Sequence, residues 1–394
     1  MILNETEKRD SFIFSLLLFI GIFSPTSING QMSNNFSFVS FFLLFVFFVL
    51  LIKKRITMVR ILLFIMINIS LLIFTVSASF IFTKYSFGIY PNFFFLSLLF
   101  FLDLKDIKVN NLVRSSFLIC TFIIIFLGVG VVFSSQAVLQ FILNYYIAGY
   151  DNLLPNMLAG FKPVGTFATH SIAALFLFIF FYLNIKTYKV LNKFIYLLCA
   201  IILLILLFFI RSNSSLIFLL FSIFILFDLF KSNKTSLIIV AVVISIIPLY
   251  FIFIDDTILV IMNKFDLSLI LSSDKNGLRG RYSSESPLQP TIDYIMSNPF
   301  SPIGLTVSDN LYYSDSGFIL YLLRGSLIMA VGIYYGMFNF FRTNVRERKS
   351  YLFIVFVLFL FEVGYPIFIY LRMLFFIPFL VVYLNHIYNL KHES

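Results

Sequence analysis

Charged residues are scarce in this chain, and their scarcity excludes the commonest class of protein. Of its 394 residues only 12% are charged, whereas 61% are hydrophobic, and the mean hydropathy is +1.02. A soluble domain is about half apolar and about a quarter charged. The composition therefore excludes an ordinary soluble domain and predicts a polytopic membrane protein.

Cysteine and histidine are also rare, with 2 and 3 residues. Cys120 and Cys199 both lie inside apolar runs without partner spacing, so we expect packing residues rather than a disulfide framework. His, Cys and carboxylate residues form no cluster at metal-ligand spacing, and no glycine-rich phosphate loop occurs. These absences predict no metal, no cofactor and no nucleotide-sugar substrate. No internal repeat is visible, which argues against a transporter built from duplicated halves.

What the chain has instead is a series of apolar runs, many of them near the length of about twenty residues that a helix needs to cross the hydrocarbon. We expect an all-α polytopic membrane protein with about 12 transmembrane helices and one large extracytoplasmic loop. The first run follows Lys8 and Arg9, as in a signal peptide, but it lacks a clear cleavage site and is expected to stay as a helix. The expected spans are residues 11–28, 36–52, 57–82, 86–102, 112–133, 169–185, 190–210, 214–230, 236–254, 316–341, 350–370 and 372–389.

These spans divide the chain into three expected parts. Residues 1–254 form an N-terminal bundle of about nine spans, residues 255–314 a large periplasmic loop with short interfacial helices, and residues 315–394 about three further spans. The loop is rich in ionisable groups, prolines and glycines, whereas most other links between spans are too short to fold alone. Chemistry is therefore expected in the loop or at the helix ends that frame it.

The net charge of +10 comes from short basic clusters between apolar runs. This pattern is typical of loops that face the cytoplasm, not of a nucleic-acid-binding surface. It predicts a multi-pass protein with both termini cytoplasmic and the large loop outside, which in a bacterial cell means the periplasm or the cell exterior. The basic residues that break the pattern are Lys84, Lys162, Arg211, Lys264, Lys275, Arg279, Arg281, Arg324 and Arg372.

Arg211 is one of these exceptions with a candidate function. It ends an unbroken apolar run and opens the polar sequence RSNSS. An arginine at the outer end of a helix can present a planar fork to a phosphate. The alternative is an arginine at the level of the lipid headgroups that only caps the span. Lys84 and Lys264 are expected to be solvated or to extend to the interface, and no function is assigned to them.

The segment GFKPVGTFATHS contains Lys162, Gly165 and His170 in a turn-rich stretch that leads into a span. Thr169 or Ser171 is expected to cap that helix. His170 is a candidate base or hydrogen-bonding group for a substrate. The alternative is an interfacial histidine whose hydrogen bonds are satisfied within the protein.

Two short helices are expected in the large loop. Residues 258–270 place their apolar side chains on one helical face, which indicates a helix lying on the membrane surface. A second helix starts near Pro290 and must stop at Asn298, because a proline follows. Between them, Arg279 and Arg281 flank a glycine and can point at one anion.

The loop ends where the tenth span begins. Asp315 and Ser316 open that span, and Asp315 is either a helix cap or a general base. Arg324 lies about two turns into the span. An arginine at that depth is costly unless it faces a partner or a wet cavity.

In this order the features resemble the O-antigen polymerase family and its relative, the O-antigen ligase family. The matching pieces are GFKPVGTFATHS before a span, IRSNSSLIFLL at a span's end, the large loop with its arginines, and NPFSPIG followed by DSGFILYLLRGSL. Two positions depart from the family pattern. Asp309 and Asn310 stand near the place of a histidine that many relatives carry, and Lys162 replaces a frequent arginine.

The resemblance implies a membrane glycosyltransferase of lipopolysaccharide or capsule synthesis. Such an enzyme moves a growing glycan from undecaprenyl pyrophosphate to a terminal sugar hydroxyl of an incoming lipid-linked repeat unit. Stabilising the leaving pyrophosphate should dominate the barrier. The implied partners are the undecaprenyl-pyrophosphate-linked oligosaccharide, membrane lipid and, as a further candidate, a chain-length regulator, with no nucleic acid.

The candidate site residues fall into two groups by role. The candidate general bases are Asp315 and Asp309. The candidate ligands of the substrate or its pyrophosphate are Arg211, Arg279, Arg281, Lys162, His170 and Arg324. No metal ligand is expected among them.

Two other functions remain open. An O-antigen ligase would send the glycan to a lipid A core, and the absent histidine argues against it. A flippase for lipid-linked oligosaccharides would have a similar number of spans. It should, however, have short loops on both sides, whereas this chain concentrates its polarity in one outer loop.

Overall fold

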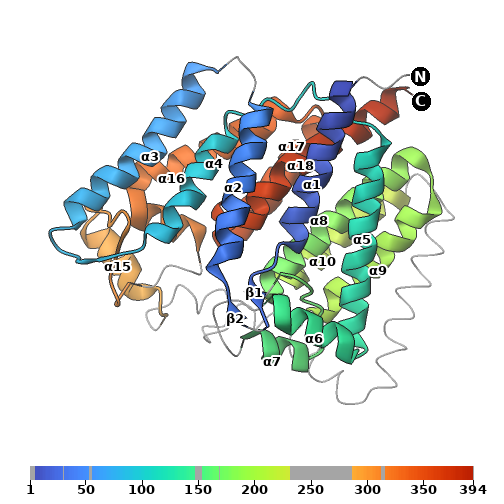
Figure 1. Cartoon of the computed structure of the whole chain (residues 1–394), viewed down its shortest axis with the longest axis horizontal. Coiled ribbons are helices and arrows are strands. Elements are labelled where there is room, and N and C mark those ends of the chain that lie inside the picture. The colour runs from blue at the N-terminus through green and yellow to red at the C-terminus, as the bar shows by residue number, and fades with distance from the viewer. Residues whose placement is uncertain are drawn as a thin grey trace. The chain divides into compact units, whose positions relative to one another are not determined.

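The computed structural model describes residues 5–29, 31–52, 56–146, 153–167, 169–230, 286–311 and 316–393, and its regular structure is almost entirely helical (Figure 1). Some predicted features lie outside these residues and stay predictions. They are Arg279, Arg281, Asp315, the interfacial helix 258–270 and the span 236–254.

Five helices among the described residues are long and apolar enough to cross a membrane. Each coincides with an expected span, so the prediction of a helical chain with membrane-spanning helices is confirmed at this level. The five are α3 (Met58–Ala78), α5 (Asn111–Val132), α8 (His170–Leu191), α16 (Gly317–Asn344) and most of α18 (Leu371–Glu393). Shorter apolar helices occupy further expected spans: α2 (Asn34–Leu51), α4 (Tyr90–Leu99), α9 (Phe194–Phe209) and α10 (Asn213–Phe230).

The chain folds into two compact units that interleave along the sequence. Unit 1 comprises Met1–Gly21, Phe38–Val113 and Leu278–Asn389, and unit 2 comprises Ile22–Ser37, Arg114–Gly277 and Leu390–Ser394. Besides α3, α4, α16 and most of α2 and α18, unit 1 holds most of α1 (Glu5–Phe23), η1 (Phe87–Ile89), α15 (Gln289–Ser297), α17 (Arg348–Glu362) and η2 (Ile367–Ile369). Besides α8 to α10 and most of α5, unit 2 holds α6 (Gln136–Tyr145), α7 (Leu153–Ala159) and the hairpin β1 (Ser27–Ile28) and β2 (Gln31–Met32).

Helix α16 is the centre of unit 1 and packs along α3 and α17. It begins where the sequence predicted, but its N-cap is Ser316, which accepts a hydrogen bond from the Ile319 amide at 3.4 Å, whereas the sequence analysis named Asp315 as the candidate cap. A kink that the sequence did not predict interrupts it at Gly325 and Ser326, whose backbone dihedrals are not helical. The kink releases two helical carbonyls, since Leu323 O and Arg324 O accept from loop amides instead (2.8 and 3.1 Å).

The helix in the expected span 350–370 is shorter than predicted. Helix α17 ends at Glu362, and a turn over Gly364 and Pro366 leads into η2. Pro366 disfavours helical geometry in the residue before it, so the helix cannot continue through this point. This break places Glu362 at a helix end rather than in mid-helix.

Unit 1 has two chemically different ends. The loop end comprises the last turn of α3, α15, the start of α16 and the ribbon of β3 (Lys84–Tyr85) with β4 (Thr306–Val307). The terminal end comprises the start of α1, the connection between α16 and α17, residues 102–106 and the end of α18. The two ends are the opposite ends of α16.

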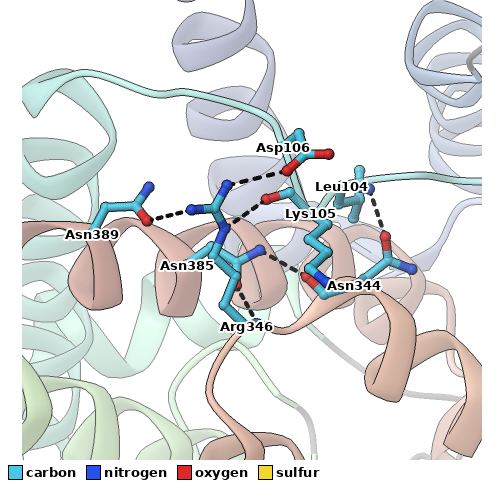
Figure 2. Close-up of polar contacts among 7 residues, drawn as sticks. All are labelled: Leu104, Lys105, Asp106, Asn344, Arg346, Asn385 and Asn389. Carbon is cyan, nitrogen blue, oxygen red and sulfur yellow. Dashed lines mark hydrogen bonds and ion pairs between the residues drawn. The ribbon is translucent and has the colours of Figure 1, made fainter. Parts of the chain in front are cut away.

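A polar cluster closes the terminal end (Figure 2). Asn344 accepts from the Leu104 amide through its side chain (2.6 Å) and from Asn385 through its carbonyl (2.8 Å). Arg346 donates to Asp106 (3.2 Å), to the Lys105 carbonyl (3.1 Å) and to Asn389 (2.9 Å). The cluster thereby fixes α16, α18 and the segment before α5 to one another.

Candidate functional site

Helices α8, α9 and α10 of unit 2 pack against one another as a bundle (Figure 1). A two-residue connection joins α8 to α9, and Asn192 in it adopts a left-handed conformation (φ 52°). The two helices pack closely and therefore run antiparallel, as α9 and α10 do across the short link 210–212. His170 at the start of α8 and Arg211 at the end of α9 consequently lie at the same end. We call this the cationic end of unit 2.

The segment that leads into α8 carries Lys162, shortly before His170 in the sequence. Its path is fixed by Thr166, whose hydroxyl donates to the Ile22 carbonyl at 2.7 Å. Gly165 adopts a left-handed conformation (φ 54°), and the space where a side chain would stand is open. Thr169 caps α8 by accepting from the Ile172 amide at 3.4 Å, so the predicted cap is confirmed and His170 is the first helical residue.

Arg211 lies between two helices in a left-handed conformation (φ 53°). A reciprocal pair of serines then opens α10. The Ser212 amide donates to the Ser215 hydroxyl (2.9 Å), and the Ser215 amide donates to the Ser212 hydroxyl (3.1 Å). This is the capping-box arrangement, which satisfies amides that a helix N-terminus otherwise leaves without partners. The polar sequence RSNSS therefore has a structural role at Ser212 and Ser215, and the Arg211 side chain that precedes them is half-buried.

The electrostatics of the cationic end favour an anion. The N-termini of α8 and α10 both lie there, and each carries a partial positive charge from its helix dipole. Burial lowers the pKa of the Arg211 guanidinium from its ordinary value, because desolvation disfavours the charged form. An anion held nearby would oppose that cost. The lysines Lys186, Lys189 and Lys193 lie at the other end of the same helices, where Lys186 stands over the Tyr182 ring at 5.6 Å.

Arg324 of unit 1 has the partner that its depth in the span requires. It is fully buried, and its Nη1 donates to the carbonyls of Gly304 (2.7 Å) and Thr306 (2.5 Å). Gly304 has φ 57° and packs directly against Thr75, whose hydroxyl accepts from the Leu305 amide at 2.8 Å. The NPFSPIG segment is therefore seated between α3 and α16. The role of Arg324 as a substrate ligand stays a prediction.

Asp309 is exposed and forms an ion pair with Lys84 across the β3–β4 ribbon, with 2.5 Å between Nζ and Oδ2. The sequence assigned no role to Lys84, because a pairing over more than two hundred residues has no local signal. Both side chains are largely solvated, so this pair contributes little to stability. Whether Asp309 takes part in catalysis stays a prediction.

Glu362 is a candidate functional residue that the sequence analysis missed. It is fully buried, and its Oε1 accepts from the Tyr321 hydroxyl (3.1 Å) and the Phe368 amide (2.7 Å). Its Oε2 has no hydrogen-bond partner among the described residues and lies where a side chain on Gly317 would stand. A carboxyl inside an apolar run was a signal that could have identified it, because intramembrane acids are rare.

The predicted site residues thus fall into three sets. Lys162, His170 and Arg211 lie in unit 2, while Asp309 and Arg324 lie at the loop end of unit 1. The third set, Arg279, Arg281 and Asp315, lies outside the described residues. Among the described residues no group of three or more His, Cys, Asp or Glu could hold a metal ion.

No protein-family model, curated protein or solved structure matches this chain.

Proposed function

We propose that this protein polymerises undecaprenyl-pyrophosphate-linked oligosaccharide repeat units into O-antigen or capsular polysaccharide. The observation that carries the proposal is the cationic end of unit 2. There, His170 and Arg211, about forty residues apart in the sequence, lie at the same end of the antiparallel helices as two helix N-termini, and Lys162 precedes α8. A pyrophosphate is the kind of ligand that this combination of fixed donors and positive charge suits.

In the proposed reaction the bond between the donor sugar's anomeric carbon and the pyrophosphate oxygen breaks. An acceptor hydroxyl oxygen on the incoming repeat unit forms the new bond to that carbon, and its proton passes to a base. Arg211, with Arg279 and Arg281 of the loop, would stabilise the leaving pyrophosphate. Asp315 and Asp309 are the candidate bases.

The topology belongs to the same proposal. We propose about 12 transmembrane helices in the bacterial inner membrane, cytoplasmic termini and a periplasmic loop over 255–314. Unit 1 supports this orientation, because Lys105, Arg346 and Lys349 gather at its terminal end. Such a bias is expected of a cytoplasmic face.

A deletion strain tests the function directly. A strain that lacks the protein should attach single repeat units to lipid A and make no long polymer, and the surface glycan can be analysed by gel and mass spectrometry. Unattached polymer would instead indicate a ligase, and repeat units that never reach the outer face would indicate a flippase. Either result would reject the polymerase.

A further inference from the structure

Helix α3 exposes one continuous apolar stripe. Its exposed apolar residues recur every three or four positions: Met58, Leu62, Ile65, Ile69, Leu72, Val76 and, just after the helix, Phe80. At 1.5 Å per residue the stripe is about 33 Å long, and the hydrocarbon core of a bilayer is about 30 Å thick. Because the two lengths agree, α3 is long enough to cross the hydrocarbon with Phe80 at its boundary on the side of the loop end.

Two tight turns at the loop end present large apolar side chains to the outside. The first closes α3 through the Ile81 amide and the Ala78 carbonyl (3.0 Å), and leaves Phe80 88% and Ile81 71% exposed. The second closes through the Ser301 amide and the Asn298 carbonyl (3.0 Å), and leaves Phe300 90% exposed. Exposing a phenylalanine side chain to water is unfavourable, and in the second turn Pro299 stiffens the backbone that holds Phe300 in this position.

Internal packing holds these two turns at the same level. Phe82, next to the first turn, packs edge-on against Tyr294 of α15, with 6.2 Å between the ring centroids. The Tyr294 hydroxyl in turn donates to the Ser301 carbonyl of the second turn at 2.9 Å. Both aromatic rings rest on one buried cluster: Ala78, Ile303, Leu311 and Leu323. The second turn is therefore fixed beside the end of the α3 stripe.

We propose that Phe80, Ile81, Met296 and Phe300 form a lipid-contacting surface, the outer patch, inserted at the boundary between the phospholipid headgroups and acyl chains. Met296 is 77% exposed at the end of α15, beside the second turn. The patch continues the apolar stripe of α3 and so lies where lipid begins, which favours phospholipid over a protein or glycan partner.

The residues that border the outer patch fit the headgroup layer. The exposed Lys84–Asp309 pair lies on the adjacent ribbon, and Asp293, one turn before Met296, accepts from Gln289 at 2.8 Å. α15 therefore enters the interface obliquely, with its last turn deepest. The patch sets the height of the β3–β4 ribbon and the Gly304 loop relative to the lipid headgroups. The inference depends on the membrane location alone and holds whether or not the proposed polymerase activity is correct.

The chain contains no tryptophan, so a single introduced indole reports its own position without background. Phe300→Trp and Met296→Trp are each reconstituted as full-length protein into phosphatidylcholine vesicles with acyl chains brominated at a shallow or a deep carbon. Both variants should lose emission in brominated lipid, more with shallow than with deep bromine. Val76→Trp, about 6 Å further into the hydrocarbon along the α3 stripe, is the matched standard for an inserted side chain and should be quenched by brominated lipid but not by aqueous iodide. Asn310→Trp, on the polar border, should respond chiefly to aqueous iodide.

Three outcomes would overturn the outer patch. Phe300→Trp and Met296→Trp could both be quenched by iodide as fully as a free indole and remain bright in brominated lipid. Their emission could instead change with the protein-to-lipid ratio but not with bromination, which would assign the patch to a second copy of the chain. In the third outcome, the two indoles are protected from iodide only when repeat-unit glycan is added, which would assign the patch to substrate. Val76→Trp shows in each case that the protein is correctly inserted.

Discussion

Arg211 and Arg324 are the same residue type and carried the same prediction, but their surroundings differ. Arg324 is fully buried, and its Nη1 donates to two loop carbonyls within unit 1. Arg211 is half-buried in unit 2, next to the capped start of α10. The comparison teaches that two arginines near span ends can have different structural surroundings, one deeply buried against loop carbonyls and one half-buried beside a helix N-terminus.

The largest effect is expected at Arg324. Replacing it by Met, in Arg324→Met, removes the donor from two buried carbonyls, which costs about 1–3 kcal/mol for each group left without a partner. The free energy of unfolding should therefore fall by about 2–6 kcal/mol. Thermal unfolding in detergent measures this, and proteolysis of the 298–306 loop should accelerate. A variant as stable as the wild type but unable to polymerise would instead make Arg324 a substrate ligand.

The opposite pattern is expected for Arg211. Lysine keeps the charge but lacks the planar fork, so Arg211→Lys should leave stability unchanged and lower the polymerisation rate by about a hundredfold to a thousandfold. Arg279→Lys and Arg281→Lys should behave alike. Polymer length and yield in a complemented deletion strain, with membrane abundance as control, measure the effect. Normal polymer from all three variants would rule out the pyrophosphate role.

Gly317 sharpens the contrast within unit 1. Because Gly317 has no side chain, the Glu362 carboxylate occupies the space that a Cβ at this position would fill. Gly317→Ala should force the carboxylate out of its contacts with Tyr321 and Phe368, and cost about 1–3 kcal/mol of unfolding free energy. Gly88→Ala is the matched control, because nothing lies within 4 Å of the added methyl group, and its Tm should hardly change. Equal Tm values for the two variants would show that Glu362 is not fixed as described.

The smallest effect is expected at Arg346, which also carries several hydrogen bonds but at the terminal end. Its side chain is 31% exposed and that of its partner Asp106 is 75% exposed, so solvent screens the pair. Arg346→Met should therefore lower the free energy of unfolding by only about 1 kcal/mol. A loss as large as that of Arg324→Met would show that hydrogen-bond number, not burial, sets the cost.

Features encoded by neighbouring residues were predictable from the sequence. The cap Thr169, the limits of α15 around Pro290 and Asn298, and the buried Cys120 and Cys199 are confirmed. Each depends on a short pattern such as a hydroxyl before a helix or a proline after one.

Features that depend on distant segments were not predictable. The kink at Gly325 and Ser326 exists because the loop amides of Ile303 and Gly304 take over helical carbonyls. The Lys84–Asp309 pair requires β3 and β4 to meet. No residue near the kink signals this partner, since glycine and serine also occur within regular membrane helices.

Asn344 has a consequence for how the protein is made. Its partners Leu104 and Asn385 lie 240 residues before it and 41 residues after it. Because a chain leaves the ribosome from its N-terminus, this cluster cannot close until α18 has been synthesised. During the interval in which α17 and α18 insert, the Asn344 carbonyl at the end of α16 therefore lacks the Asn385 side-chain amide that later donates to it. Shortening the chain before Asn385 should hence yield a protein that quality-control proteases recognise, even though every earlier span is complete.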